Sequence, residues 1–175
     1  MTYRIAAVAA LGVFALGAGT ASAAAPKKNT ITAVGGMKVK ANAYVQDAQH
    51  WDADRYTVKS GDTVTLRDKS TEGQPHTLSL IKKLPKTPAQ IMGCEACGPL
   101  MEAHQANPET GEVGQPLVEA GGAGFDTGGD KNAAGDSIYL PPKGKVTFKV
   151  TVKKGATLNF VCAVHPWMLG TIKVS

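Results

Sequence analysis

Hydrophobic and polar residues alternate along several short stretches of this chain. The clearest alternation runs through residues 145–152, where apolar residues occupy one face and lysines or threonines the other. Shorter runs of strand-forming residues lie at 55–59, 63–67, 76–81, 137–140, 157–161 and 171–174. Successive side chains of a β-strand point to opposite faces, so these runs predict strands that bury a face in a common core.

The pattern before residue 76 is weaker but still strand-like. Partial alternation from residue 30 to residue 45 predicts a strand that is interrupted at Gly35 and Gly36. The two runs on either side of Gly61-Asp62 predict a β-ribbon joined by that turn. About seven short strands separated by turn residues are typical of an all-β sandwich, which is the fold class that we expect.

A long segment from residue 82 to residue 136 lacks strand signals. Pro, Gly, Asn and acidic residues dominate it, and only residues 99–106 have a helical pattern, with Pro at the start. A segment of this length inside a compact domain is either functional or partly disordered. We therefore expect one domain over residues 30–175 that carries a mostly irregular insert at 82–136.

The first residues have the features of an export signal. Arg4 precedes an apolar run over residues 5–18, and Ala21-Ser22-Ala23 provides a small-x-small cleavage site. This pattern predicts a signal peptide over residues 1–23, with cleavage near 23–25. The apolar run is short for a membrane span, and a retained N-terminal anchor is the alternative. We expect an exported protein, periplasmic or extracellular, with no stable membrane insertion after cleavage.

The charge balance differs between the insert and the rest of the chain. The sequence has 19 basic and 14 acidic residues, a formal net charge of +5. The insert has a net charge of −4, whereas residues 137–175 contain six lysines and no acid. Lysines spread along strands, without arginines between aromatic residues, argue against nucleic acid as a partner. An acidic protein surface fits this charge better, and a merely solvated surface is the alternative.

Three cysteines are an odd number for an exported protein. Cys94 and Cys97 lie close together, which leaves Cys162 for another role. A disulfide between Cys94 and Cys97 would staple the insert locally. A second metal site that includes His104 is the other possibility, whereas a thioredoxin-like role lacks its βαβ context.

The strongest candidate for chemistry is the loop near the C-terminus. Cys162, His165 and Met168 are three residues apart, so one loop can place a thiolate, an imidazole and a thioether near one point. His76, at the start of a strand and after Pro75, offers a second imidazole from another part of the chain. Two imidazoles, a thiolate and a weak thioether are the ligands that suit copper in an electron-transfer site. The sequence therefore predicts a copper site formed by these four side chains.

The residues around these ligands resemble the cupredoxins, or small blue copper proteins, and among them the amicyanin and plastocyanin-like group. The Cys-x-x-His-x-x-Met spacing, with Pro166 and Trp167 inside it, is similar to the short ligand loop of the amicyanin group. Residues 58–64 are similar to the family's Val-Lys-x-Gly-Asp-x-Val strand pair. The resemblance implies a Greek-key β-sandwich, one type 1 copper that alternates between Cu(I) and Cu(II), and one-electron transfer.

The resemblance also implies an electron carrier rather than an enzyme. We expect a monomer that exchanges electrons with a redox protein, docked near Pro166, Trp167 and Leu169. In this interpretation His165 lies on the exposed loop and is the point of electron exit. Two alternatives stay open: a copper enzyme with an open mononuclear site, and a copper buffering or delivery protein that uses the cysteines of the insert.

Two features depart from the family pattern. The family commonly has Asn after the first histidine, tied to a Ser or Thr after the cysteine, but this chain has Thr77 and Ala163 there. We expect that the tie between the two ligand loops cannot form in the usual way, and outer hydrogen bonds of this kind tune metal sites. The second departure is the insert at 82–136, which has no counterpart in the small members.

Overall fold

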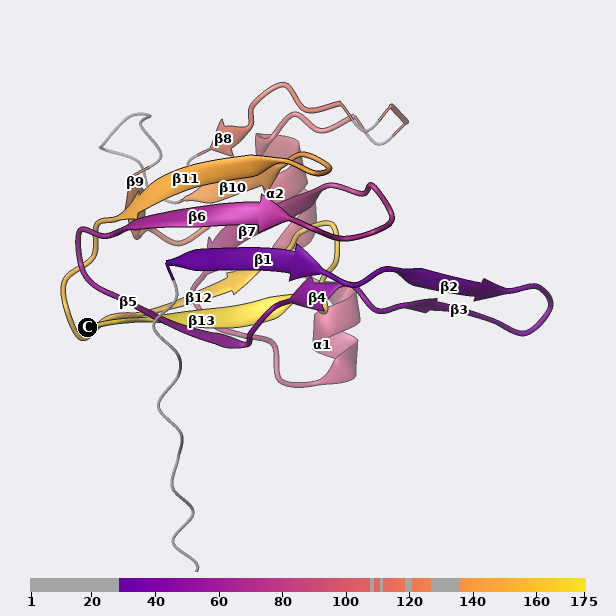
Figure 1. Cartoon of the computed structure of the whole chain (residues 1–175), viewed down its shortest axis with the longest axis horizontal. Coiled ribbons are helices and arrows are strands. Elements are labelled where there is room, and N and C mark those ends of the chain that lie inside the picture. The colour runs from indigo at the N-terminus through magenta and orange to yellow at the C-terminus, as the bar shows by residue number, and fades with distance from the viewer. Residues whose placement is uncertain (1–28, 108, 111, 119–120, 127–135) are drawn as a thin grey trace, which may run out of the picture.

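Two β-sheets packed face to face form the body of the protein (Figure 1). The computed structural model describes residues 29–107, 109–110, 112–118, 121–126 and 136–175, so the expected signal peptide lies outside the described residues. One sheet contains, in order, β4 (His50–Trp51), β1 (Thr30–Val34), β6 (Thr63–Asp68), β11 (Lys145–Val150) and β9 (Phe125–Asp126). The other contains, in order, β5 (Arg55–Val58), β13 (Leu169–Val174), β12 (Thr157–Val161), β7 (His76–Ile81), β10 (Ser137–Leu140) and β8 (Leu117–Val118). The predicted Greek-key β-sandwich is confirmed.

The core lies between the sheets and explains the alternation in the sequence. In β11, Phe148 and Val150 are buried, whereas Lys145 and Lys149 are exposed. β7 is different, because five of its six residues are buried, and these include the polar residues Thr77 and Ser79. Burying one such aliphatic or aromatic side chain contributes about 1.5–3 kcal/mol. The sheets are therefore held together mainly by this shared core.

The expected β-ribbon around Gly61-Asp62 is wrong, although both of its strands exist. β5 pairs in parallel with β13, whereas β6 pairs with β1 and β11 in the opposite sheet. Each strand buries one apolar face, and placing them in facing sheets lets both faces enter the same core. Gly61, with φ of 84°, makes the turn between the sheets.

The expected strand over residues 30–45 is three strands. After β1, the strands β2 (Met37–Lys40) and β3 (Tyr44–Asp47) form a two-stranded hairpin that projects from the sandwich (Figure 1). Asn42 has φ of 59° at its turn, a conformation that asparagine tolerates. Val39 and Val45 face each other across the hairpin and are 69% and 66% exposed. The period-2 signal predicted strand correctly here, but not burial.

The described part of the insert is mostly irregular, as expected, but it includes four short regular elements. It contains the helices α1 (Pro88–Gly93) and α2 (Cys97–Ala103), as well as β8 and β9. The helix expected at 99–106 corresponds to α2, whereas α1 was not expected even though Thr87 caps it by accepting from the Gln90 amide. A disulfide joins Cys94 to Cys97 and links the two helices, which confirms the disulfide interpretation.

The α2 helix packs on the outer side of the strand that leads to the candidate ligand loop. Cys97 and Leu100 form a small buried cluster with Val161 and Ala163, the two neighbours of Cys162. The insert therefore supports this strand end from outside the main core. In the described part of the chain, no helix has the length and apolar character that a membrane span requires.

Candidate metal centre

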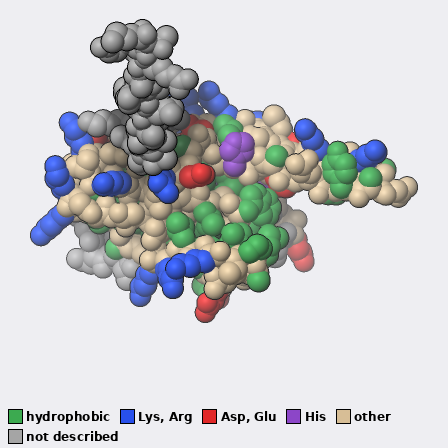
Figure 2. Space-filling model, turned by 90° about the horizontal axis from the view of Figure 1, so that it is seen from below, with side chains coloured by type: hydrophobic (Ala, Val, Ile, Leu, Met, Phe, Trp, Pro, Cys, Tyr) green, Lys and Arg blue, Asp and Glu red, His purple; other side chains and the backbone are tan. Residues whose placement is uncertain are grey.

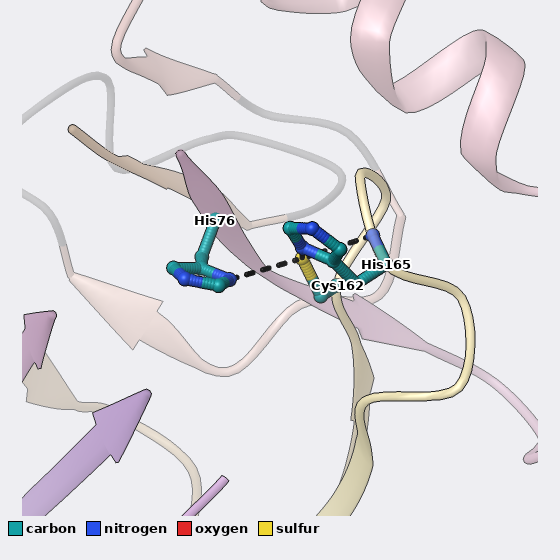
Figure 3. Close-up of side chains that lie close together, drawn as sticks. All are labelled: His76, Cys162 and His165. Carbon is teal, nitrogen blue, oxygen red and sulfur yellow. Dashed lines mark hydrogen bonds between the residues drawn. The ribbon is translucent and has the colours of Figure 1, made fainter. Parts of the chain in front are cut away.

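His76, Cys162 and His165 meet between the start of β7 and the loop that joins β12 to β13 (Figure 3). Their donor atoms all lie within 4.8 Å of one another, and the side chains are 0%, 0% and 2% exposed. The Cys162 sulfur lies 4.0 Å from Nδ1 of His76 and 3.7 Å from Nδ1 of His165. Within the described ranges, this is the cluster of His, Cys or acidic residues that could hold a metal ion.

The strand register brings the two distant segments together. β7 and β12 are antiparallel neighbours with Val161 opposite Ser79, so the end of β12 meets the start of β7. Cys162 follows directly, and its amide donates to the Met168 carbonyl at 3.0 Å, which closes the ligand loop. A second bond, from the Met168 amide to the His165 carbonyl at 2.8 Å, tightens the turn. The loop is thus folded by its own backbone.

The imidazole of His76 is oriented by groups behind it. Its Nε2 lies 3.6 Å from Asp68 Oδ1 and 3.4 Å from Ser70 Oγ, so Nδ1 faces the sulfur. Burial and the nearby His165 lower the pKa of His76 to about 4. The ring is therefore neutral at pH 7, and a neutral imidazole is the form that binds metals.

The imidazole of His165 is held in a similar way. Its Nε2 lies 2.7 Å from Gln74 Oε1, an atom that can only accept, so Nε2 carries the proton. The Gln49 side chain lies at the same edge of the ring, 3.1 Å from Nε2. Burial lowers the pKa of His165 as well. Both imidazoles thus turn an Nδ1 lone pair toward one sulfur atom.

The Cys162 sulfur accepts hydrogen bonds that suit a thiolate. The backbone amides of Thr77 and His165 donate to it at 3.3 and 3.4 Å. Burial nevertheless raises the pKa of this thiol overall, because the sulfur is fully enclosed. A metal ion must therefore displace the thiol proton when it binds.

Met168 lies beside this group in the core. Its side chain is 1% exposed and belongs to the same buried cluster as Cys162. Its carbonyl also accepts from the Trp51 indole at 3.1 Å, which anchors the end of the loop. The role of its thioether as a fourth ligand stays a prediction.

His165 is itself buried within the ligand loop, and its role as the point of electron exit stays a prediction. Only 2% of the residue is exposed, because Gln74 and Gln49 cover its Nε2 edge. Trp167 packs against it with ring centroids 5.4 Å apart and donates from its indole to the Gln49 carbonyl at 3.0 Å. Trp167 is itself 36% exposed, so its side chain is a part of this loop that reaches the surface.

The two ligand loops are tied together, although not by the usual pair of side chains. Thr77 Oγ1 accepts from the backbone amide of Ala163 at 2.7 Å. A main-chain donor replaces the side chain that Ala163 lacks, so the hydroxyl of Thr77 is enough to form the bond. Because the donor is a backbone amide, the identity of the side chain at position 163 does not reveal this bond.

Sequence reasoning also missed the residues that orient the two imidazoles. Gln74 stands two positions before His76, and its place in the ligand segment was the one available signal. Asp68 and Ser70 precede the same segment, where Asp68 accepts from the Ser70 amide at 2.7 Å. Gln49 gives no signal in the sequence, because it is 116 positions away from His165.

Comparison with known proteins gives structural matches only. No family model and no curated protein matches the sequence. The similar solved structures are cupredoxins. An auracyanin from Roseiflexus castenholzii is 19% identical over 86% of this chain and 99% of its own, with a TM-score of 0.43. Auracyanin A from Chloroflexus aurantiacus is 18% identical over 83% and 98%, with a TM-score of 0.43. A purple cupredoxin from Nitrosopumilus maritimus is 15% identical over 83% and 98%, with a TM-score of 0.40.

Proposed function

We propose that this protein is an exported blue copper protein that binds one copper ion and carries single electrons between redox partners. The observation that supports this most is the convergence of two imidazole Nδ1 atoms on the buried Cys162 sulfur. A soft thiolate with two imidazoles suits copper better than the oxygen-binding metals. His76, Cys162 and His165 would hold the ion, with the thioether of Met168 as a weak fourth ligand.

The surroundings of the site favour electron transfer over catalysis. Bound copper would supply a centre that alternates between two oxidation states. Asp68 and Gln74 fix the two imidazoles from behind, so the ligands need little rearrangement between those states. Burial of the three donors leaves little room for a substrate. The disulfide between Cys94 and Cys97 removes the thiols that a copper delivery role would use.

Copper loading tests this proposal directly. We expect titration with Cu(II) to give one copper per chain, an intense thiolate-to-copper band in the visible region, and a reversible one-electron reduction. Azide separates the carrier from an enzyme with an open site, because a closed site keeps its spectrum when azide is added. Loading without the visible band would contradict the proposal, and a band that shifts with azide would favour the enzyme.

The partner's docking site is proposed beside the ligand loop. Pro166 and Val161 line a groove of about 710 Å³ whose other walls come from the start of the insert. Lys82, Lys83 and Lys86 line it too, with a single acid, Glu95. Figure 2, viewed from the side where α1 lies in Figure 1, shows hydrophobic side chains gathered on this face with basic ones beside them. A redox protein with an acidic surface and an apolar contact fits such a groove.

Charge reversal at the groove should change the rate of electron exchange. In Lys82→Glu/Lys86→Glu, oxidation of the reduced protein by an anionic metal complex should slow by roughly 10-fold at low ionic strength, because the attractive field is lost. Stopped-flow measurements would give the rate, and a cationic complex should show the opposite trend. Lys38→Glu/Lys40→Glu, on the projecting hairpin, is the matched control. Equal slowing in both double variants would contradict docking at the groove.

A further inference from the structure

A continuous row of buried hydrogen bonds connects the insert to the metal centre. His104, at the end of α2, places Nδ1 2.6 Å from the Gln115 carbonyl and Nε2 2.8 Å from Ser137 Oγ. Ser137 Oγ lies 2.6 Å from Ser79 Oγ, which donates to Thr77 Oγ1 at 2.9 Å. The residues His104, Ser137, Ser79 and Thr77 are all 0% exposed, so these groups depend on one another for partners.

The row ends at the metal-binding sulfur. The Thr77 backbone amide donates to the Cys162 sulfur at 3.3 Å, and the Thr77 side chain acts on the same sulfur by lowering the pKa of its thiol. The hydroxyl oxygen of Thr77 also accepts from the Ala163 amide at 2.7 Å. A hydroxyl group has one hydrogen and two acceptor positions. With Ser79 and Ala163 both donating to its oxygen, Thr77 has its own hydrogen left for the sulfur.

The row has one hydrogen too few when His104 is neutral. It consists of five contacts, and both ends, the Gln115 carbonyl and a metal-bound thiolate, can only accept. The three hydroxyl groups and a neutral imidazole together provide one hydrogen fewer than these contacts need. A protonated imidazole provides the missing one, because both of its nitrogens then donate.

The two charge states therefore order the hydroxyl hydrogens differently. With His104 protonated, Ser137 donates to Ser79, Ser79 to Thr77, and Thr77 to the sulfur. With His104 neutral, its Nδ1 hydrogen remains on the Gln115 carbonyl and Nε2 must accept from Ser137. Ser79 then turns its hydrogen to Ser137 and no longer donates to Thr77. The Thr77 hydroxyl is less polarised as a result, and its interaction with the sulfur weakens. Only rotations about C–O bonds separate the two arrangements.

We propose that His104 is a positioning residue for the metal centre, acting on the Cys162 sulfur through Ser137, Ser79 and Thr77. This inference rests on the proposed function, because it concerns a metal-bound thiolate. A hydrogen bond to a thiolate draws electron density from the sulfur and favours the reduced state of the centre. Coupling is reciprocal, so reduction favours protonation of His104. On reduction, the metal centre receives one electron from the reduced partner, and His104 binds one proton from solvent. Both leave on oxidation.

The surroundings of His104 keep its imidazole mostly neutral at pH 7, and two other titratable residues, Tyr139 and Asp136, lie near the row. Burial lowers the pKa of His104, although its bond to the Gln115 carbonyl partly opposes this, so the neutral form dominates at pH 7. Tyr139, on β10, faces the imidazole with ring centroids 6.1 Å apart. Asp136, next to Ser137, turns its carboxylate to the backbone amides of Gly124 and Phe125.

The reduction potential of the copper-loaded protein, measured against pH, tests the proposal. We expect the wild-type potential to rise as the pH falls, and Ser79→Ala to lose the part of this rise that His104 contributes. Ser79→Thr keeps a hydroxyl and should restore it. Tyr139→Phe, an equally small change beside His104 but outside the row, should leave the profile unchanged. Identical profiles for wild type and Ser79→Ala, or the same loss in Tyr139→Phe, would overturn the proposal.

A second readout does not depend on redox chemistry. NMR titration of His104 should show a higher protonation midpoint in the Zn(II)-loaded protein than in the metal-free protein, because loading turns the thiol into a thiolate. Ser79→Ala should abolish this difference while it still binds Zn(II). A midpoint shift that survives in Ser79→Ala would sink the proposal. A missing visible band with copper would instead count against the proposed function alone, since the Zn(II) comparison still decides the role of His104.

Discussion

Replacing Cys162 with serine should abolish the visible absorption of the copper-loaded protein and weaken copper binding far more than any other single change. The band requires a sulfur bound to copper, and a hydroxyl group is a poor ligand for Cu(I). Loss of a residue that only orients a metal ligand typically costs 10–100-fold in affinity, so loss of the thiolate should cost more than about 100-fold. Visible spectroscopy and competition with a copper chelator would measure both effects.

The other two cysteines provide the matched control. Cys94→Ser/Cys97→Ser removes the disulfide outside the ligand set, so the band should keep its intensity and one copper should still bind. This variant should lose only roughly 2 kcal/mol of unfolding free energy, because a disulfide that closes a very short loop restricts the unfolded chain less than one that closes a long loop. A band that survives in Cys162→Ser, or disappears in the double variant, would place the copper elsewhere.

The ligands could be predicted from the sequence because their signals are local. Cys162, His165 and Met168 lie on one loop, and the loop lies between two runs that predict strands. His76 follows a proline at the start of another such run. Strand ends within one sheet are often adjacent, so short-range patterns sufficed to bring three of these donors together.

The groups that position the ligands could not be predicted, because they come from distant segments. Gln49 reaches His165 from the end of the hairpin region, and its place depends on how β4 folds back beside β1. His104 reaches Thr77 only through residues on β7 and β10. Long-range pairings of this kind depend on strand order, and alternation along one strand carries no information about which strand lies beside it.

The same limit explains the errors in the fold. The hydrophobic pattern around Gly61 predicted two strands correctly, but a turn residue does not say whether the chain continues in the same sheet or crosses to the facing one. The hairpin of β2 and β3 shows a further limit, because alternation there has no core to face. Periodicity predicts the local backbone, whereas burial depends on the whole fold.

The stability of the metal-free protein should fall as the pH is lowered from about 6.5 toward 4. Folding lowers the pKa of His76 from 6.5 to about 4, so between these values the unfolded chain binds more protons than the folded one. Stability from such a group is fully present above the unfolded pKa and is lost as the pH falls. The loss from His76 is about 3 kcal/mol, and His104 and His165 add losses of the same sign, because their pKa values are also lowered. Urea unfolding at a series of pH values, in the presence of a chelator, would measure it.

Two variants distinguish the contribution of His76 from destabilisation by acid at other groups of the protein. His76→Gln removes the titrating group, so its unfolding free energy should depend less steeply on pH over this interval, whatever its value at neutral pH. His50→Gln, at an exposed position on β4, should keep the wild-type slope. An unchanged slope in His76→Gln would mean that folding does not lower the pKa of His76, and it would contradict this prediction.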